Sequence, residues 1–155
     1  MANLRREIAM SEEEVAAFLA ERHTATMCTL NQDGSIHAVA MWYGFFEGRL
    51  ALQTKAKSQK ARNLSRDARM TCLVEAGERY DELRGVELVG RAVLLEEPDQ
   101  VFAVGASVFD RYVAAYTEES RNAVETMLKK RVAFVLDVGR TVSWDHRKLA
   151  TATPG

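Results

Sequence analysis

The sequence predicts a mainly β protein, a six-stranded antiparallel barrel with helices packed outside it. Short turns at residues 31–34 and 47–48 separate apolar, strand-like runs, and an Asp-Gly step tolerates the positive φ of such turns. No strand–helix–strand alternation persists along the chain, which argues against a parallel doubly wound sheet. Gly85 and Gly90 interrupt a long strand-like run, as glycines do at bulges and barrel corners.

The first elements are defined by a helix cap and by the two turns. Ser11 and Glu14 form a capping box, and apolar residues follow at helical spacing, so a helix is expected over residues 11–22. The turns join the next three runs into a predicted antiparallel meander. Its expected strands are residues 24–30, 35–46 and 49–54.

The rest of the chain supplies three more strands and three helices. The expected strands are residues 69–76, 83–95 and 131–138, and the expected helices are residues 58–66, 98–113 and 117–130. Residues 141–149 are too polar for a strand and are expected to form a tail that carries Trp144.

Length and composition indicate one globular domain. The chain has 155 residues and 47% hydrophobic residues, so a single domain over residues 1–155 is expected, with a core over 11–149 and a polar C-terminal tail over 141–155. The net charge of −1 argues against overall attraction to nucleic acid or to an anionic membrane. No apolar run reaches the roughly 18–20 residues of a spanning helix, so a cytoplasmic protein is expected.

The cysteines and histidines do not suggest a metal site. Cys28 and Cys72 lie in apolar runs and are expected to be buried free thiols. The three histidines, at positions 23, 37 and 146, are scattered, and with the cysteines they show no metal-ligand spacing.

A basic segment follows the third predicted strand. From Lys55 to Arg69 there are six basic residues against one acid, a local charge of +5. A strand end followed by a helix start near Ser58 offers free N–H groups and a favourable dipole to an anion. Thr54 and Lys60 could add hydroxyl and charge-assisted hydrogen bonds. The alternative is a solvated basic helix face.

Two further segments allow a functional and a structural interpretation. In the strand from His37 to Trp42, small residues would let a flat group approach the backbone, although plain barrel core gives the same pattern. Trp144 stands among charged residues, which is typical either of a segment laid over another subunit or of a tail docked on its own barrel.

In their order and spacing, five segments together resemble the pyridoxamine-phosphate-oxidase-like split β-barrel family, and most closely its actinobacterial branch, which uses coenzyme F420 or FMN. They are TMCTLNQDGSIH (26–37), GRLALQT (48–54), SQKARNL (58–64), GVELVGRA (85–92) and SWDHR (143–147). The last segment departs from the Arg-Leu-His-Asp-Arg motif of the true oxidases, which argues against vitamin B6 oxidation.

The resemblance implies a homodimer with the cofactor site at the subunit interface. The cofactor ring would lie on the second strand, its phosphate at the end of the third strand and the following helix start, and the partner's tail would close over the ring. The implied cofactor-binding residues are His37, Val39, Ala40, Met41, Trp42, Gln53, Thr54, Lys55, Ser58, Gln59, Lys60 and Trp144. No catalytic side chain and no metal are implied.

The implied function is an oxidoreductase that moves a hydride between coenzyme F420, or alternatively FMN, and a small organic acceptor. Such a protein needs positioning and electrostatics from its side chains, because the cofactor carries the chemistry. A binding or carrier protein for a flavin, deazaflavin or haem is the alternative. Binding to nucleic acid or to a membrane is not expected.

Overall fold

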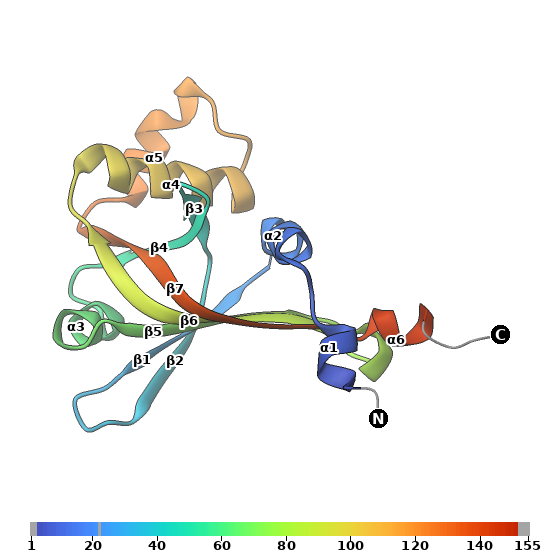
Figure 1. The fold of residues 1–155 in the computed structure, drawn as a ribbon. Coiled ribbons are helices and arrows are strands. Elements are labelled where there is room, and N and C mark those ends of the chain that lie inside the picture. The colour runs from blue at the N-terminus through green and yellow to red at the C-terminus, as the bar shows by residue number, and fades with distance from the viewer. Residues whose placement is uncertain (1–2, 22, 152–155) are drawn as a thin grey trace.

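A single seven-stranded antiparallel sheet organises the chain in the computed structural model, which describes residues 3–21 and 23–151 (Figure 1). The strand order is β2-β1-β5-β6-β7-β4-β3. The strands are β1 (Ala25–Leu30), β2 (Ile36–Met41), β3 (Gly44–Phe46), β4 (Arg49–Lys55), β5 (Arg69–Ala76), β6 (Arg84–Leu95) and β7 (Arg131–Asp145). The predicted antiparallel barrel is confirmed as a curled sheet, with seven strands in place of six.

The seventh strand arises because the predicted strand over residues 35–46 is broken. Tyr43 is fully buried between β2 and β3, and its hydroxyl donates to the Leu19 carbonyl oxygen at 2.7 Å. The chain therefore turns inward at this point, and β2 and β3 end at opposite edges of the sheet. The predicted three-stranded meander is wrong, since β2 pairs with β1 while β3 pairs with β4.

The last strand is longer than the sequence indicated. β7 continues to Asp145, so residues 141–145 are strand and not tail, and α6 (Arg147–Thr151) follows. The twelve-residue β6 pairs along β7 up to Asp145, with a bulge between Val89 and Gly90. A Cβ at Gly90 would lie 2.0 Å from the Asp137 carbonyl oxygen, so this close approach requires glycine.

Helices cover part of the sheet. The capping box at Ser11 is confirmed and begins α2 (Glu12–Ala20). Two shorter elements, η2 (Glu118–Ser120) and α5 (Arg121–Met127), replace the single helix predicted over residues 117–130. The remaining helices are α1 (Leu4–Ile8), which the sequence did not predict, α3 (Gln59–Arg66), η1 (Tyr80–Glu82) and α4 (Pro98–Tyr112).

The core lies on the inner face of the sheet. Met27, Met70 and Cys72 are buried there. Cys28 is half-buried and on the other face, because it pairs with Thr71 while Met27 pairs with Cys72. Both thiols are free, as predicted. None of the helices in residues 3–21 and 23–151 has the length and apolar character that crossing a bilayer requires.

Candidate cofactor-binding site

Strands β2 and β4 carry most of the predicted site residues, and they separate from each other beyond the β3–β4 hairpin. β3 and β4 pair as far as Gly44 and Ala51. Beyond that pair, β2 turns away to β1, while residues 51–55 of β4 pair with β7. The sheet is therefore split between β2 and the second half of β4. Helix α3 occupies the opening and is hydrogen-bonded to β4 on one side and to β1 on the other (Figure 1).

The start of α3 is joined to the end of β4 by hydroxyl groups. The Thr54 hydroxyl donates to the Ser58 Oγ at 3.2 Å, and that oxygen accepts the Ala61 N–H at 3.2 Å as the helix N-cap. Thr54 is buried and Ser58 is half-buried. The positive end of an eight-residue helix dipole thus opens at the strand end, as the sequence predicted.

A second cation meets Lys60 beside this helix start. Arg131 pairs with Lys55 across β4 and β7, and its Nη1 donates to the Gln53 Oε1 at 3.1 Å. Burial and the nearby Arg131 charge lower the pKa of Lys60. Within the described residues, neither Lys60 nor Arg131 forms an ion pair with an acid. An anion bound between them would relieve their repulsion.

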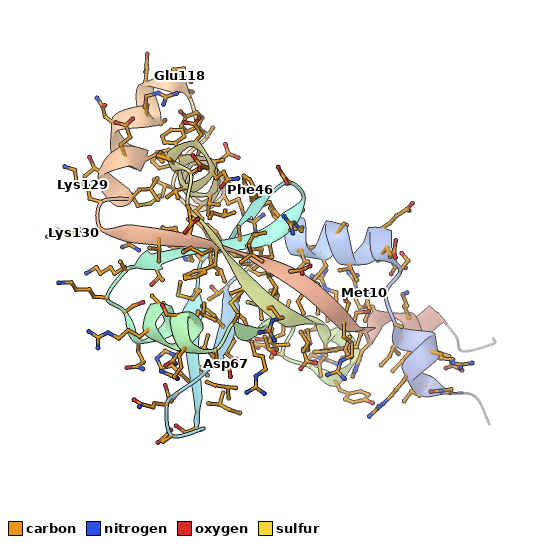
Figure 2. The ribbon with its side chains drawn as sticks, turned by 60° about the vertical axis from the view of Figure 1, so that its left-hand side comes forward. Met10, Phe46, Asp67, Glu118, Lys129 and Lys130 are labelled. Carbon is orange, nitrogen blue, oxygen red and sulfur yellow. The ribbon has the colours of Figure 1, made fainter. Side chains whose placement is uncertain are left out.

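The turn before β7 brings Lys130 to the start of α3. The Ala56 N–H donates to the Lys130 carbonyl oxygen at 2.9 Å, which brings this turn against the start of α3. Lys129 and Lys130 are exposed and lie together where α5 leads into β7 (Figure 2). The sequence prediction missed these two lysines and Arg131, although the run Lys-Lys-Arg ahead of an apolar strand was a visible signal.

A buried amide holds α3 against β1. The Asn63 Nδ2 donates to the Thr29 Oγ1 at 3.0 Å and to the Asn31 Oδ1 at 2.9 Å. The Asn63 Oδ1 accepts from the Gln59 Nε2 at 2.9 Å and from the Arg66 Nη2 at 3.1 Å. Gln59, a predicted cofactor ligand, is thus tied into the network that positions the helix.

The predicted ring strand, β2, lies at the edge of the sheet and exposes small residues. Ala40 is on the outer face and exposed, whereas His37, Val39 and Met41 face the interior and are half-buried. The approach of a flat group to this strand stays a prediction, and Ala40 is the exposed position at which it would occur. The buried His37 Nδ1 has no hydrogen-bond partner among the described residues.

Trp144 is remote from the predicted phosphate-binding residues of its own chain. It lies opposite Gly85 near the end of β7, whereas Arg131 begins that strand. At roughly 3.3 Å per residue, the two are separated by about 40 Å of strand. A cavity of about 870 Å³ adjoins Trp144 at this far end. Its other lining residues include Arg5, Met10 and His146.

The donor set fits a phosphate-bearing cofactor. A helix N-terminus, two hydroxyls and the basic residues Lys55, Lys60 and Arg131 lie where strand β4 ends. The neighbouring edge strand offers small side chains to a flat ring. These residues can bind and orient such a group, and its reactive ring would have to supply the chemistry.

Comparisons with known proteins agree with this geometry. The family model described as pyridoxamine 5'-phosphate oxidase matches residues 11–145. Among solved structures, Rv2991 from Mycobacterium tuberculosis is 45% identical with a TM-score of 0.92, over 99% of this chain and 96% of that one.

More distant structures share the fold alone. An F420 reductase is 22% identical with a TM-score of 0.58, over 81% of this chain and 93% of that one. HutZ, a haem storage protein from Vibrio cholerae, is 16% identical with a TM-score of 0.65, over 85% and 96% of the two chains. A comparison with curated proteins finds no significant match.

Proposed function

The chain belongs to the pyridoxamine 5'-phosphate oxidase family, and from that premise we propose that it is an oxidoreductase that uses coenzyme F420 to reduce a small organic acceptor. The observation that carries the proposal is the start of α3, where the Thr54 hydroxyl meets the Ser58 N-cap at 3.2 Å beside the half-buried Lys60. A helix N-terminus attracts an anion, and burial together with the Arg131 charge lowers the pKa of the Lys60 beside it, so a bound anion would stabilise the charged lysine.

The residues that would hold the cofactor phosphate are Thr54, Ser58 and Lys60, with Lys55 beside them. Hydrogen bonds from a charged donor to phosphate are about twice as strong as neutral ones. Arg131 already bonds the Gln53 side chain, so it holds that amide in place while it adds positive charge.

Coenzyme F420 suits the site better than FMN, the alternative cofactor. F420 bears a carboxylate-rich oligoglutamyl tail in addition to its phosphate. Lys57 and Lys130 lie around the helix start and exceed the needs of one phosphate. Their positive charge would attract the additional carboxylates.

The ring would lie along β2, where Ala40 leaves the backbone accessible. When bound, the reduced cofactor would supply a hydride to the acceptor, which would take one proton from water. The half-buried His37, Val39 and Met41 lie on the opposite, inner face of the same strand, where Val39 and Met41 pack against the core and would hold the strand in place beneath the ring.

We further propose a homodimer in the cytoplasm. The partner's Trp144 would then close over the ring, since the Trp144 of the same chain is separated from the phosphate residues by about 40 Å of strand.

Turnover by the loaded protein tests this function. The purified protein is loaded with reduced F420 or reduced FMN and mixed with quinones, enones and a biliverdin-like tetrapyrrole. The proposal expects oxidation of the cofactor with matching reduction of at least one acceptor. Tight binding without any turnover would instead support the carrier alternative, and a parallel haemin titration tests the haem form of that alternative.

A further inference from the structure

Helix α4 covers one part of the outer face of the sheet. On β4 and β7, Ala51 and Val135 are buried in a cluster with Val104 of α4. On β1 and β6, the side chains on the same face are less covered, and both Cys28 and Val89 are only half-buried. The outer face over β2, β1, β5, β6 and the second half of β7 is therefore available to a partner.

Strand pairing arranges this part of the face into two adjacent rows of side chains. The first row, from β2 to β7, is Ala40, Thr26, Leu73, Glu87 and Val142. The second row is Ala38, Cys28, Thr71, Val89 and Arg140. We call these residues the outer patch. With neighbouring strands about 4.8 Å apart, the patch is about 20 Å wide, which is wider than a single cofactor ring.

Exposed charged residues border the outer patch at both ends of its strands. Glu75 lies beyond the first row, where it pairs with Gly85. Arg69, Arg91 and Asp137 lie beyond the second row and pair with one another across β5, β6 and β7. An uncharged centre inside a polar rim is the usual anatomy of a protein–protein interface.

The outer patch itself contains two charged residues, which have opposite signs. Glu87 is half-buried on β6, and Arg140 is exposed on β7. Within residues 3–21 and 23–151, neither side chain forms an ion pair or a hydrogen bond. Burial and the nearby Glu87 charge raise the pKa of the Cys28 thiol, which shows that the carboxylate lies beside the centre of the patch. A partner that covers the patch therefore has to neutralise both charges.

A second copy of the chain meets this requirement. A two-fold symmetric interface brings the same surface of both chains together, so that a residue of one chain contacts a different residue of the other. The outer patch carries one acid and one base and is thus complementary to itself. A uniformly acidic or basic partner would instead place a like charge against Glu87 or Arg140, which opposes association.

We propose that the outer patch is the surface through which two chains associate, and that Glu87 pairs with the partner's Arg140. The proposal rests on the homodimer of the proposed function and adds the face and the charge pair that form it. Trp144 lies opposite Gly85 on the same face, one row beyond Glu87. Association through this face therefore also brings Trp144 to the interface.

Exchange of the two charges tests the pairing between chains. E87R carries positive charge at both positions, and R140E carries negative charge at both. In analytical ultracentrifugation, the dimer dissociation constant of each variant alone should rise about tenfold or more. An equimolar mixture of the two variants should form a heterodimer as tight as the wild-type dimer, because opposite charges then meet at both contacts. E119R, a similar change at an exposed position of η2, should dimerise like wild type.

The mixture separates pairing between chains from pairing within one chain. If Glu87 and Arg140 acted within one chain, mixing the variants would not tighten the dimer. That result, or wild-type affinity in E87R and R140E alone, would overturn the proposal. If either variant fails to fold by itself, its co-expression with the other variant must yield a folded heterodimer, and the absence of a heterodimer would likewise overturn it.

This interface and the proposed function fail separately. A wild-type dimer that is insensitive to both charge changes overturns the interface, and F420 titration of that dimer still tests cofactor use. A dimer that follows the charge exchange but binds neither F420 nor FMN overturns the proposed function alone. A wild-type protein that sediments as a monomer overturns the interface and the homodimer together.

Discussion

Arg131 and Trp144 lie near opposite ends of one strand, β7, with about 40 Å of extended chain between them. Arg131 pairs with Lys55 just before the start of α3, while Trp144 lies against Gly85 beside the 870 Å³ cavity. In the proposed homodimer, Arg131 of one chain and Trp144 of the other would contribute to the same site.

Mixed dimers test this shared site. K60A and W144A subunits are co-expressed with different tags, and the heterodimer is isolated. One of its two sites combines the intact Lys60 with the intact Trp144, so F420 titration should show one tight site per dimer. Each homodimer should show none. A heterodimer without a tight site, or a protein that sediments as a monomer at micromolar concentration, would contradict the two-chain site.

Trp144→Ala should loosen the cofactor ring more than the phosphate. An aromatic contact buried at an interface contributes about 1–3 kcal/mol, so F420 should bind about 5- to 150-fold more weakly. Inorganic phosphate, which lacks a ring, should compete for the site as well as in the wild-type protein. An unchanged F420 affinity and an unchanged cofactor spectrum would mean that Trp144 lies elsewhere in the assembly.

Asn63→Ala should destabilise the protein and weaken cofactor binding together. The substitution leaves the buried Thr29 hydroxyl without its donor, and it removes the bonds that hold α3 to β1. Such losses cost about 1–3 kcal/mol each. Urea unfolding measures the change, with Asn122→Ala, an exposed site on α5, as a control expected to stay within about 0.5 kcal/mol.

Short-range sequence patterns predicted the residues of the proposed phosphate-binding part of the site. The end of a β-rich run at Thr54 and a serine N-cap at Ser58 are contiguous in sequence, so their juxtaposition needs no tertiary information. The capping box that begins α2 was equally readable, because its two partners, Ser11 and Glu14, are three residues apart.

Features of the fold and site that depend on long-range strand pairing or on burial could not be predicted from the sequence. Arg131 is 71 residues beyond Lys60, and only the β4–β7 register brings them together. Residues 141–145 look too polar for a strand, yet pairing with β6 extends β7 through them. Burial of Tyr43 breaks an apparently continuous strand, and no local pattern distinguishes this residue from its aromatic neighbours.

The end of β7 should be sensitive to acid. Asp145 is buried, and its hydrogen bonds with Arg147 lower the pKa of the carboxyl. Its contribution to stability is therefore present above the unfolded-state pKa of about 3.9 and is lost as the pH falls through the folded-state pKa. Asp145→Asn should be less stable than wild type at pH 7 and less sensitive to acid below pH 4.

Urea midpoints measured between pH 7 and pH 2 check this dependence. Asp137→Asn, at an exposed position of the same strand, is the matched control and should follow the wild-type curve. Parallel curves for Asp145→Asn and wild type would show that the pair with Arg147 does not stabilise the fold.

Calorimetric titration with F420 and FMN is the most direct test of the proposed cofactor site at Lys60. It uses the wild type, K60A and the control R79A. Arg79→Ala removes the same charge from an exposed position near η1. Wild type and R79A should bind F420 alike and more tightly than FMN. K60A should bind about 10- to 100-fold more weakly, since a charge-assisted hydrogen bond contributes about 1.5–3 kcal/mol. Its empty form should be no less stable, because a repelled charge is gone. A loss below about twofold in folded K60A, or no binding of either cofactor to the wild type, would contradict the account.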